Sequence, residues 1–431
     1  MKKLNEIEDK SMLSLSFNQD NSCFAIGMES GFKIYQTYPL KGPVKRKMFG
    51  GIGSVEMFYK SNFLALLGGG KIPKFNNNRV VIWDDFEEKI ISEIKFITPI
   101  LGIKLKKNLL FIICQKRIYV FNFNTYDIIE IIDTGDNKKG LIAINNSQDL
   151  TVIAYPSIKD LNYVTIKHFK PNKTLTILAH DDSVSSMTIN YDGSLLATAN
   201  EKGIIIRIYS CKDGTFLQEF KRGSGKVDYL YICFDNETRF MAVSSNKGTI
   251  HIFTMGNIIK KLKDIENMKH ENENKNNEKL KNKKVDEKND TDEKFFLEEK
   301  KEKDEFFLKP KDIKEEGKEE EKNIDKDKKE ENLESKNIIN DTNINNDKNN
   351  KNENEEELPK NVRAFFGFSQ TEKSFAQFKI KPQKNICTFA NNNILIVISF
   401  DNIYYQAEID LKKGGICKKK DEINLIENNS I

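Results

Sequence analysis

A repeat of about 43 residues most constrains the fold of this chain. Each copy contains a short apolar segment, a polar turn that often ends in glycine, and a second short apolar segment. Gly203 and Gly248 end two such turns 45 residues apart, and Gly31 lies four steps of 43 before Gly203. A period of about 40–45 residues with four short strands per unit is typical of a β-propeller.

Seven units can be counted along the sequence, beginning near residues 11, 53, 98, 140, 183, 227 and 384. We therefore predict an all-β fold, a seven-bladed, WD-repeat-like β-propeller. The sixth unit is interrupted between its third and fourth strands by a tract in which Lys, Glu, Asn and Asp dominate. Such a tract cannot bury enough apolar surface to offset the entropy lost on ordering, and we predict that it is disordered.

Strand-like sequence on both sides of this tract indicates a loop inserted within one domain rather than a linker between two. The expected organisation has four parts: blades one to six up to the insertion (1–256), the inserted loop (257–361), the end of blade six with blade seven (362–411), and a C-terminal tail (412–431).

The overall composition argues against several classes of protein. Lys and Arg number 69 against 65 Asp and Glu, a net charge of +4, so no global field favours a nucleic-acid partner. The six cysteines form no CxxC pair, the start of the chain lacks the apolar core of a secretory signal, and no window approaches the roughly 18 apolar residues of a membrane span. We expect a cytoplasmic monomer that is not an enzyme and has no metal or cofactor, because no catalytic or phosphate-loop motif is found.

Two adjacent cations stand in the segment Phe220-Lys221-Arg222-Gly223, directly after a predicted strand. Neighbouring side chains on a strand point to opposite faces, so these two cannot easily serve one ligand. One interpretation is an exposed edge strand that Lys and Arg protect from aggregation. The other is a pair of anion pockets, one on each side of the strand.

This motif, followed by SSNKGTIHIF and a long insertion, resembles the PROPPIN family of phosphoinositide-binding propellers, whose members carry Phe-Arg-Arg-Gly at this place. The resemblance covers 11–256 and about 362–411. SLSFNQDNSCFAIGMESGFKIY and LLGGGKIPKFNNNRVVIWDD look most like the branch that works with a lipid-transfer protein in autophagosome growth. The resemblance implies a peripheral adaptor for phosphatidylinositol 3-phosphate, with the 3,5-bisphosphate as a further candidate, on endosomal, autophagosomal or related membranes.

The resemblance also implies two phosphoinositide pockets beside the motif, which includes Gly223. The family pattern assigns to the Arg222 pocket the residues Ser244, Ser245, Lys247, Thr249 and His251. It assigns to the Lys221 pocket His180, Asn200, Gly203 and Arg207. Asn200 and Ile204 replace the usual small hydroxyl and Thr, and lysine lacks the bidentate fork of arginine, so we expect a weaker or altered first pocket. The competing interpretations are an ordinary blade turn for SSNKGTIH and a structural hydrogen-bonding role for His180.

Apolar residues in the insertion and a polar turn in blade one complete the candidates. In the family this loop lies against the membrane, which implies as insertion candidates Phe295, Phe296, Phe306, Phe307, Phe365 and Phe366. The alternative is that these residues are incidental to a low-complexity tract. Asn18 and Asp20 match partner-contact residues of the similar branch, although Asn and Asp are also good turn formers.

Two other functions compete with lipid binding. A propeller scaffold that binds only proteins would need no basic pair opposite hydroxyl-rich turns. A nucleic-acid binder would use the Lys-rich insertion, but that tract alternates Lys with Glu and Asp, so its local field largely cancels.

Overall fold

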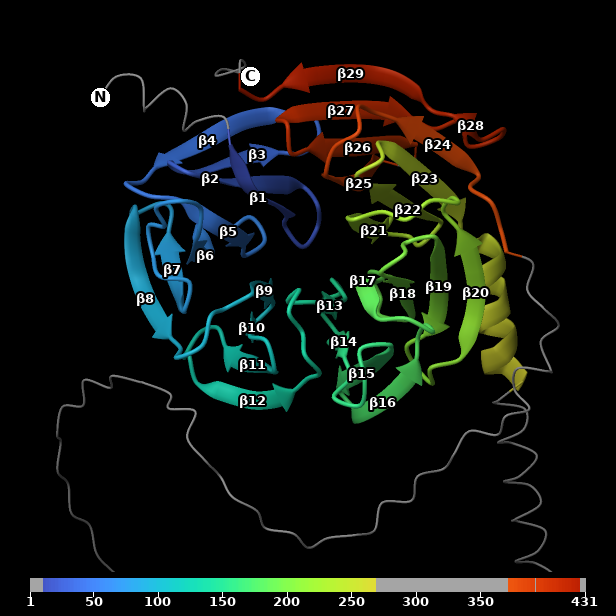
Figure 1. The fold of residues 1–431 in the computed structure, drawn as a ribbon, viewed down its shortest axis with the longest axis horizontal. Coiled ribbons are helices and arrows are strands. Elements are labelled where there is room, and N and C mark those ends of the chain that lie inside the picture. The colour runs from blue at the N-terminus through green and yellow to red at the C-terminus, as the bar shows by residue number, and fades with distance from the viewer. Residues whose placement is uncertain (1–10, 269–370, 392, 427–431) are drawn as a thin grey trace, which may run out of the picture. The chain divides into compact units, whose positions relative to one another are not determined.

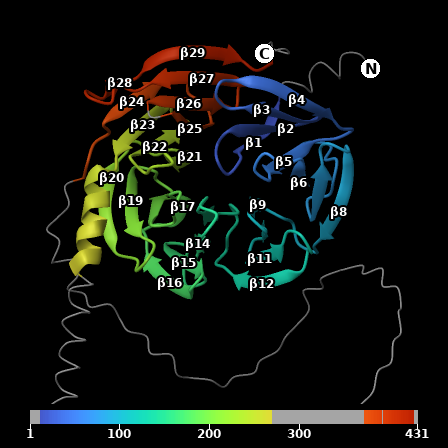
Figure 2. The same ribbon diagram turned by 180° about the vertical axis from the view of Figure 1, so that it is seen from behind.

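The computed structural model describes residues 11–268, 371–391 and 393–426. It contains two compact units, Met1–Ile259 together with Asn337–Ile431, and Lys260–Lys336. The described strands belong to the first unit, where seven sheets are arranged as blades around a ring (Figure 1). Figure 2 shows the same circular order from behind. The predicted seven-bladed propeller is therefore confirmed.

Blades one to four are antiparallel sheets whose strands follow the chain order. Their strands are β1 (Met12–Phe17), β2 (Cys23–Met28), β3 (Gly31–Gln36) and β4 (Lys41–Lys47); β5 (Ile52–Met57), β6 (Phe63–Gly68), β7 (Arg79–Asp84) and β8 (Lys89–Lys95); β9 (Gly102–Lys106), β10 (Leu109–Ile113), β11 (Arg117–Asn122) and β12 (Ile128–Asp133); and β13 (Ala143–Ile144), β14 (Val152–Pro156), β15 (Tyr163–Phe169) and β16 (Asn172–Leu178).

Blades five to seven close the ring and include the predicted site. Their strands are β17 (Val184–Ile189), β18 (Leu195–Asn200), β19 (Ile205–Ser210) and β20 (Phe216–Lys221); β21 (Leu230–Phe234), β22 (Phe240–Ser245), β23 (Thr249–Thr254), β24 (Ala376–Lys379) and the short β28 (Gly415–Ile416); and β25 (Asn385–Asn391), β26 (Ile394–Ser399), β27 (Ile403–Glu408) and β29 (Lys418–Asn424).

Burial explains why the middle strands are so apolar. The core clusters each draw on two neighbouring blades, for example Leu196 and Tyr209 of blade five with Ile166 of blade four. Both faces of a middle strand are therefore covered, which requires continuous apolar sequence rather than alternation. The ring closes between the ends of the chain, where the hydroxyl of Tyr404 donates to the carbonyl of Thr37 at 2.9 Å.

The inserted tract interrupts blade six as predicted, since β24 pairs with β23 although residues 255–375 separate them. Its predicted disorder concerns mainly 269–370, which lie outside the described residues. The predicted beginning of the loop at 257 is wrong, because 256–268 are helical. Ile258, Leu262 and Ile265 recur at helical spacing there, a pattern that the surrounding charges concealed.

The predicted tail at 412–431 is also wrong. Residues 418–424 form β29, which pairs with β27 along Ile403–Glu408 as the fourth strand of blade seven. The sequence KKKDEIN is polar because an outermost strand has one edge and much of its surface in water. Its composition therefore resembled that of a tail.

Candidate functional site

Lys221 and Arg222 face different blades. Lys221 is opposite Ile205 in the β19–β20 ladder, and the amide of Arg222 continues the ladder by donating to the carbonyl of Ile204 at 2.8 Å. Alternation therefore places Lys221 on the face of Arg207 and Glu219, and Arg222 on the opposite face, with Phe220.

Two contacts identify these faces. The ring of Phe220 packs against Phe253 of blade six, with centroids 4.8 Å apart, so Arg222 lies on the side of blade six. The hydroxyl of Tyr209, on the Arg207 face, donates to Ala179 at the end of blade four at 2.6 Å. Lys221 thus belongs to the side of blade four.

Arg222 is only 6% exposed. Among the described residues, no carboxylate forms an ion pair with its guanidinium. Its Nε donates to the carbonyl of Gly203 at 2.6 Å, and Nη2 donates to the carbonyl of Gly225. Gly203 has a φ of +61°, and a Cβ there would meet the Val227 side chain at 2.5 Å. Burial lowers the pKa of Arg222. The turn thus holds a desolvated guanidinium in place through carbonyl groups.

Blade six presents His251, Thr249 and Ser245 on the face turned toward Arg222, because Phe253 shares that face. His251 Nδ1 lies 3.3 Å from the hydroxyl of Ser374. Burial, and then the positive charge of Arg222, lower the pKa of His251 to about 4. The imidazole is therefore neutral at pH 7 and can take a proton when an anion arrives.

Ser244 does not lie on that face. It neighbours Ser245 on β22, so it points the other way, together with Ala242 and Ile250, whose cluster includes blade-seven residues. Its hydroxyl is buried and has no hydrogen-bond partner in the described part of the chain. Lys247 is exposed in the β22–β23 turn. The family pattern named both serines, but a strand can present only one of them to Arg222.

The Lys221 side is occupied by the protein's own charges. Arg207 Nε lies 3.1 Å from Glu219 Oε2, and Nη2 lies 3.7 Å from Asp181. His180 is 2% exposed, and its Nε2 lies 3.0 Å from the hydroxyl of Thr198. Burial, and then the charge of Arg207, lower the pKa of His180 to about 4. The burial of His180 and its contact with Thr198 agree with the alternative interpretation, a structural hydrogen-bonding role.

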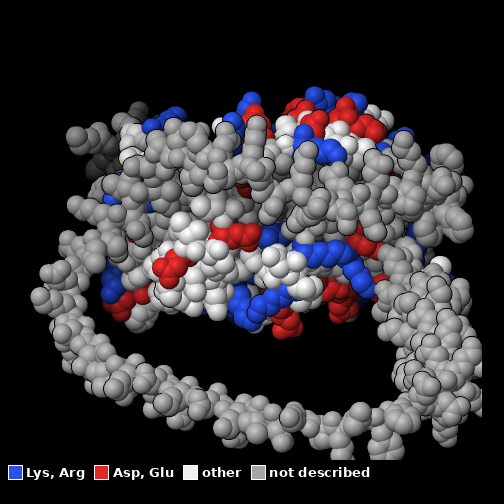
Figure 3. Space-filling view, turned by 90° about the horizontal axis from the view of Figure 1, so that it is seen from below, with Lys and Arg blue, Asp and Glu red and all other residues white. Residues whose placement is uncertain are grey.

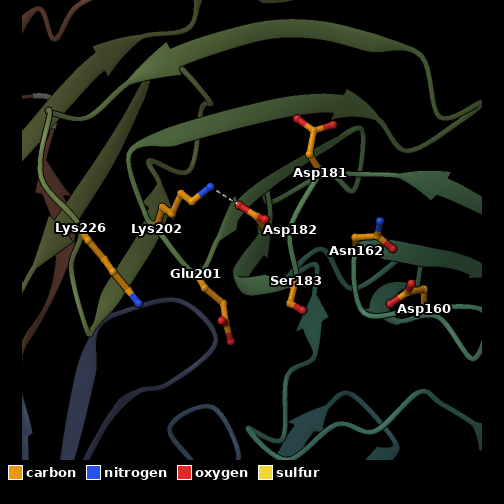
Figure 4. A pocket seen from close by; sticks show the side chains of 8 residues that line it. All are labelled: Asp160, Asn162, Asp181, Asp182, Ser183, Glu201, Lys202 and Lys226. Carbon is orange, nitrogen blue, oxygen red and sulfur yellow. Dashed lines mark ion pairs between the residues drawn. The ribbon is translucent and has the colours of Figure 1, made fainter.

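The side chain of Asn200 also forms hydrogen bonds within the protein, at the turn that follows β18. Its Oδ1 accepts from the amide of Gly203 at 3.2 Å, and its Nδ2 donates to Asp182 at 3.4 Å. Beside it lies a hollow of about 340 Å³ (Figure 4), lined by Asp160, Asn162, Asp181, Asp182, Ser183, Glu201, Lys202 and Lys226. Lys202 and Asp182 point toward each other and form an ion pair at 2.7 Å. Four carboxylates against two ammonium groups make this hollow unfavourable for phosphate.

Charges elsewhere are mixed. On the side of the molecule seen in Figure 3, basic and acidic side chains of the described residues lie next to one another among uncharged ones. Within the described part of the chain, no group of three or more His, Cys, Asp or Glu side chains is placed to hold a metal ion. No helix there is long and apolar enough to span a membrane.

Asn18 is not available to a partner. It is 2% exposed, its Oδ1 accepts from the amide of Cys23, and its Nδ2 donates to the carbonyl of Tyr59. The same amide-to-side-chain bond recurs in three other blades, at Asn145, Asn190 and Asp235. Asn18 is thus a repeated turn residue, and the repeat between FNQDNSCF and INYDGSLL could have revealed it.

Asp20 is exposed, but it holds the same turn. Its Oδ1 accepts from the amide and the hydroxyl of Ser22, as Asp192 does from Ser194 in blade five.

The six phenylalanines proposed for membrane insertion all lie outside the described residues.

Sequence reasoning missed the residues of β24, which complete the blade-six side. Gln377 is opposite His251 and Lys379 is opposite Thr249. Ser374, just before the strand, contacts His251. A signal existed, because Phe378-Lys379 repeats Phe220-Lys221 at the corresponding end of the next blade.

Comparisons with known proteins agree with this architecture. The family model PROPPIN matches residues 11–271. Autophagy-related protein 18e of Arabidopsis thaliana is 34% identical over 254 residues, covering 57% of this chain and 67% of that protein. SVP1-like protein 2 of Saccharomyces cerevisiae is 32% identical over 277 residues, covering 56% and 62%. The match therefore spans about two thirds of these relatives or less.

Solved structures are similar in fold over nearly the whole chain. Kluyveromyces lactis Hsv2 has a TM-score of 0.61 at 16% identity, with 96% of this chain and 99% of that chain covered. A complex of KlAtg21 with the coiled coil of AgAtg16 has a TM-score of 0.60 at 16% identity, with the same coverage.

Proposed function

Because the chain belongs to the PROPPIN family of phosphoinositide-binding β-propellers, we propose that it is a peripheral membrane adaptor that recognises phosphatidylinositol 3-phosphate through Arg222. The 3,5-bisphosphate is the second lipid that it would accept. The observation that carries the proposal is a buried Arg222 guanidinium that faces neutral His251 and has no carboxylate partner among the described residues.

The chemistry of this site suits a phosphomonoester. Such a group has nearly two negative charges and several acceptor oxygens, so it needs a cation together with hydroxyl or amide donors. Arg222 supplies the charge, and Thr249, Ser245 and His251 lie on the facing strands. Charge-assisted hydrogen bonds contribute roughly 1.5–3 kcal/mol each, enough for a few such bonds to give micromolar affinity.

The Lys221 side is the weaker candidate. Glu219 neutralises Arg207 there, and the adjoining hollow is rich in carboxylates. Lys221 itself is exposed, and it can add general attraction to an anionic surface without forming a pocket.

We propose further that the protein acts beside membranes as a recruiting platform. Blades one to three lie across the ring from blades five and six (Figure 1), so they would remain accessible when the rim at Arg222 meets a lipid surface. An autophagic lipid-transfer protein is the partner that the sequence resemblance suggests. The coiled coil bound to KlAtg21 makes a helical partner a second candidate.

Co-sedimentation with vesicles that each contain one phosphoinositide tests the proposal. Arg222→Thr is expected to lose binding to 3-phosphorylated lipid, whereas Lys221→Thr is the matched neighbour that should lose much less. Because Arg222 also bonds two carbonyl groups, the melting temperature of each variant must accompany the binding data. A wild-type protein without lipid selectivity would instead be a scaffold that binds only proteins.

A further inference from the structure

The ends of blades five and six are built on the same register. In blade five, Ile205, Ile206 and Arg207 pair with Lys221, Phe220 and Glu219. In blade six, the corresponding residues Thr249, Ile250 and His251 pair with Lys379, Phe378 and Gln377. Phe220 and Phe378 are both buried, at 0% and 2% exposure. Lys379 therefore occupies in blade six the position of Lys221 in blade five.

This equivalence places Lys379 beside the Arg222 site. Lys379 shares a face with Thr249 and His251, because directly paired residues point the same way. That face is turned toward blade five, as the contact between Phe253 and Phe220 requires. Arg222 points from blade five toward the same face. Among the strand positions that face this space, Arg222 supplies a buried cation and Lys379 an exposed one.

The two equivalent positions differ in their charged neighbours. Where blade five has the ion pair Arg207–Glu219, blade six has His251 and Gln377, which is uncharged. Lys379 forms no ion pair with the described residues, whereas Lys221 shares its face with Glu219. Next in the chain, Ile380 takes the position of Arg222, so the repeat does not direct another cation toward blade seven.

We propose that Lys379 is the second cation of the Arg222 site and that it determines the preference for a headgroup with two phosphates. Buried Arg222 holds the 3-phosphate, while Lys379 at the open end contacts a second phosphate on the same inositol ring, the 5-phosphate. This inference rests on the proposed function of the Arg222 site. It adds the residue that separates bisphosphate from monophosphate.

The test compares wild type, Lys379→Gln, Lys95→Gln and Arg222→Thr on vesicles that contain phosphatidylinositol 3-phosphate or the 3,5-bisphosphate. Lys95 is the matched control, since it pairs with Arg79 at the same place in blade two, on a distant part of the ring. We expect Lys379→Gln to weaken bisphosphate binding about tenfold and monophosphate binding by less than about threefold, because only one charged contact is lost. Lys95→Gln should change neither.

Titration with the soluble headgroups, inositol 1,3-bisphosphate and inositol 1,3,5-trisphosphate, separates pocket binding from attraction to the membrane surface. The same selective loss with soluble headgroups would support the inference. An equal loss for both lipids, or no loss, would overturn it while leaving the Arg222 site intact. Failure of wild type to bind either lipid, or indifference of both lipids to Arg222→Thr, would overturn the proposed function itself. Lys379 is exposed at the end of β24, beyond the residues that pair with β28, so its replacement should leave the melting temperature unchanged.

Discussion

Arg222 of blade five and His251 of blade six share one space between the blades, and the charge of the arginine helps to hold the histidine neutral. Partial burial of His251 is the larger cause of its lowered pKa, and the positive charge of buried Arg222 lowers the pKa further. A site built in this way has one fixed charge and one charge that the ligand can induce.

Binding to the Arg222 site should therefore strengthen as the pH falls below 7. The pKa of His251 is about 4 in the free protein, and a bound phosphate raises it because it favours the imidazolium. At a pH between the two pKa values of His251, the imidazole is protonated in the complex but not in the free protein. Affinity therefore rises as the pH decreases. Affinities measured at pH 7 and pH 5.5 for wild type and His251→Gln test this.

The phosphate itself becomes less charged below about pH 6, which acts in the opposite direction. The difference between wild type and His251→Gln is the informative quantity, because this ligand effect is common to both. Identical pH profiles for the two proteins would show that His251 does not touch the anion.

Two single substitutions at equivalent positions of blades five and six should change anion affinity in opposite directions. Gln377→Glu places a carboxylate opposite His251 and two residues from Lys379, and we expect phosphoinositide affinity to fall about tenfold, by like-charge repulsion. Glu219→Gln releases Arg207 and removes a carboxylate beside Lys221, so weak additional anion binding should be gained. Titration with inositol phosphates measures both. A Gln377→Glu variant with undiminished affinity would place the ligand elsewhere.

His180 should make the stability of the propeller depend on pH. Its pKa is about 4 in the folded protein against about 6.5 in an unfolded chain, so the unfolded chain binds the proton first as pH falls. Its contribution is fully present above pH 6.5 and is lost between 6.5 and 4, by at most about 3 kcal/mol. Thermal unfolding of wild type and His180→Asn at pH 7 and pH 5 tests this, with the variant expected to lose less on acidification. An equal loss in both proteins would assign the effect to other groups.

Asn18→Ala should destabilise the fold rather than remove a partner contact. Its buried side chain accepts from one amide and donates to the Tyr59 carbonyl of the next blade, so we expect a loss of about 1–3 kcal/mol. Asn190→Ala is the matched variant in blade five, because the same turn bond is present there. Comparable melting-temperature losses are expected, whereas a partner defect in Asn18→Ala at unchanged stability would restore the recognition role.

The number of blades could be predicted because glycine turns and apolar strands repeat along the chain. The opposite directions of Lys221 and Arg222 follow from strand alternation alone. Local composition failed at β29 and at 256–268, where polar sequence forms an outer strand and a helix. The sequence did not predict that Gln377 and Lys379 lie near Arg222. That placement depends on the pairing of β24 with β23, whose partner residues are more than 120 positions apart in the chain.

The family pattern also did not indicate that acidic side chains lie beside Lys221. Glu219 lies within the predicted strand, two residues before Lys221, and only the register with Arg207 shows that it neutralises a proposed ligand residue. Residue types at the motif positions therefore indicated where a pocket could form, but not which charges surround it.

The split of blade six also has a consequence for synthesis of the chain. Between β23 and β24 the ribosome must add the 121 residues 255–375, which takes roughly 6–24 s at ordinary rates of about 5–20 residues per second. During that interval the outer edge of β23, with His251 on it, has no neighbouring strand, and an unpaired edge is a template for wrong pairing. The proposed anion site is thus completed only after β24 emerges, so a nascent chain that stops within the insertion would display the FKRG turn without β24 beside it.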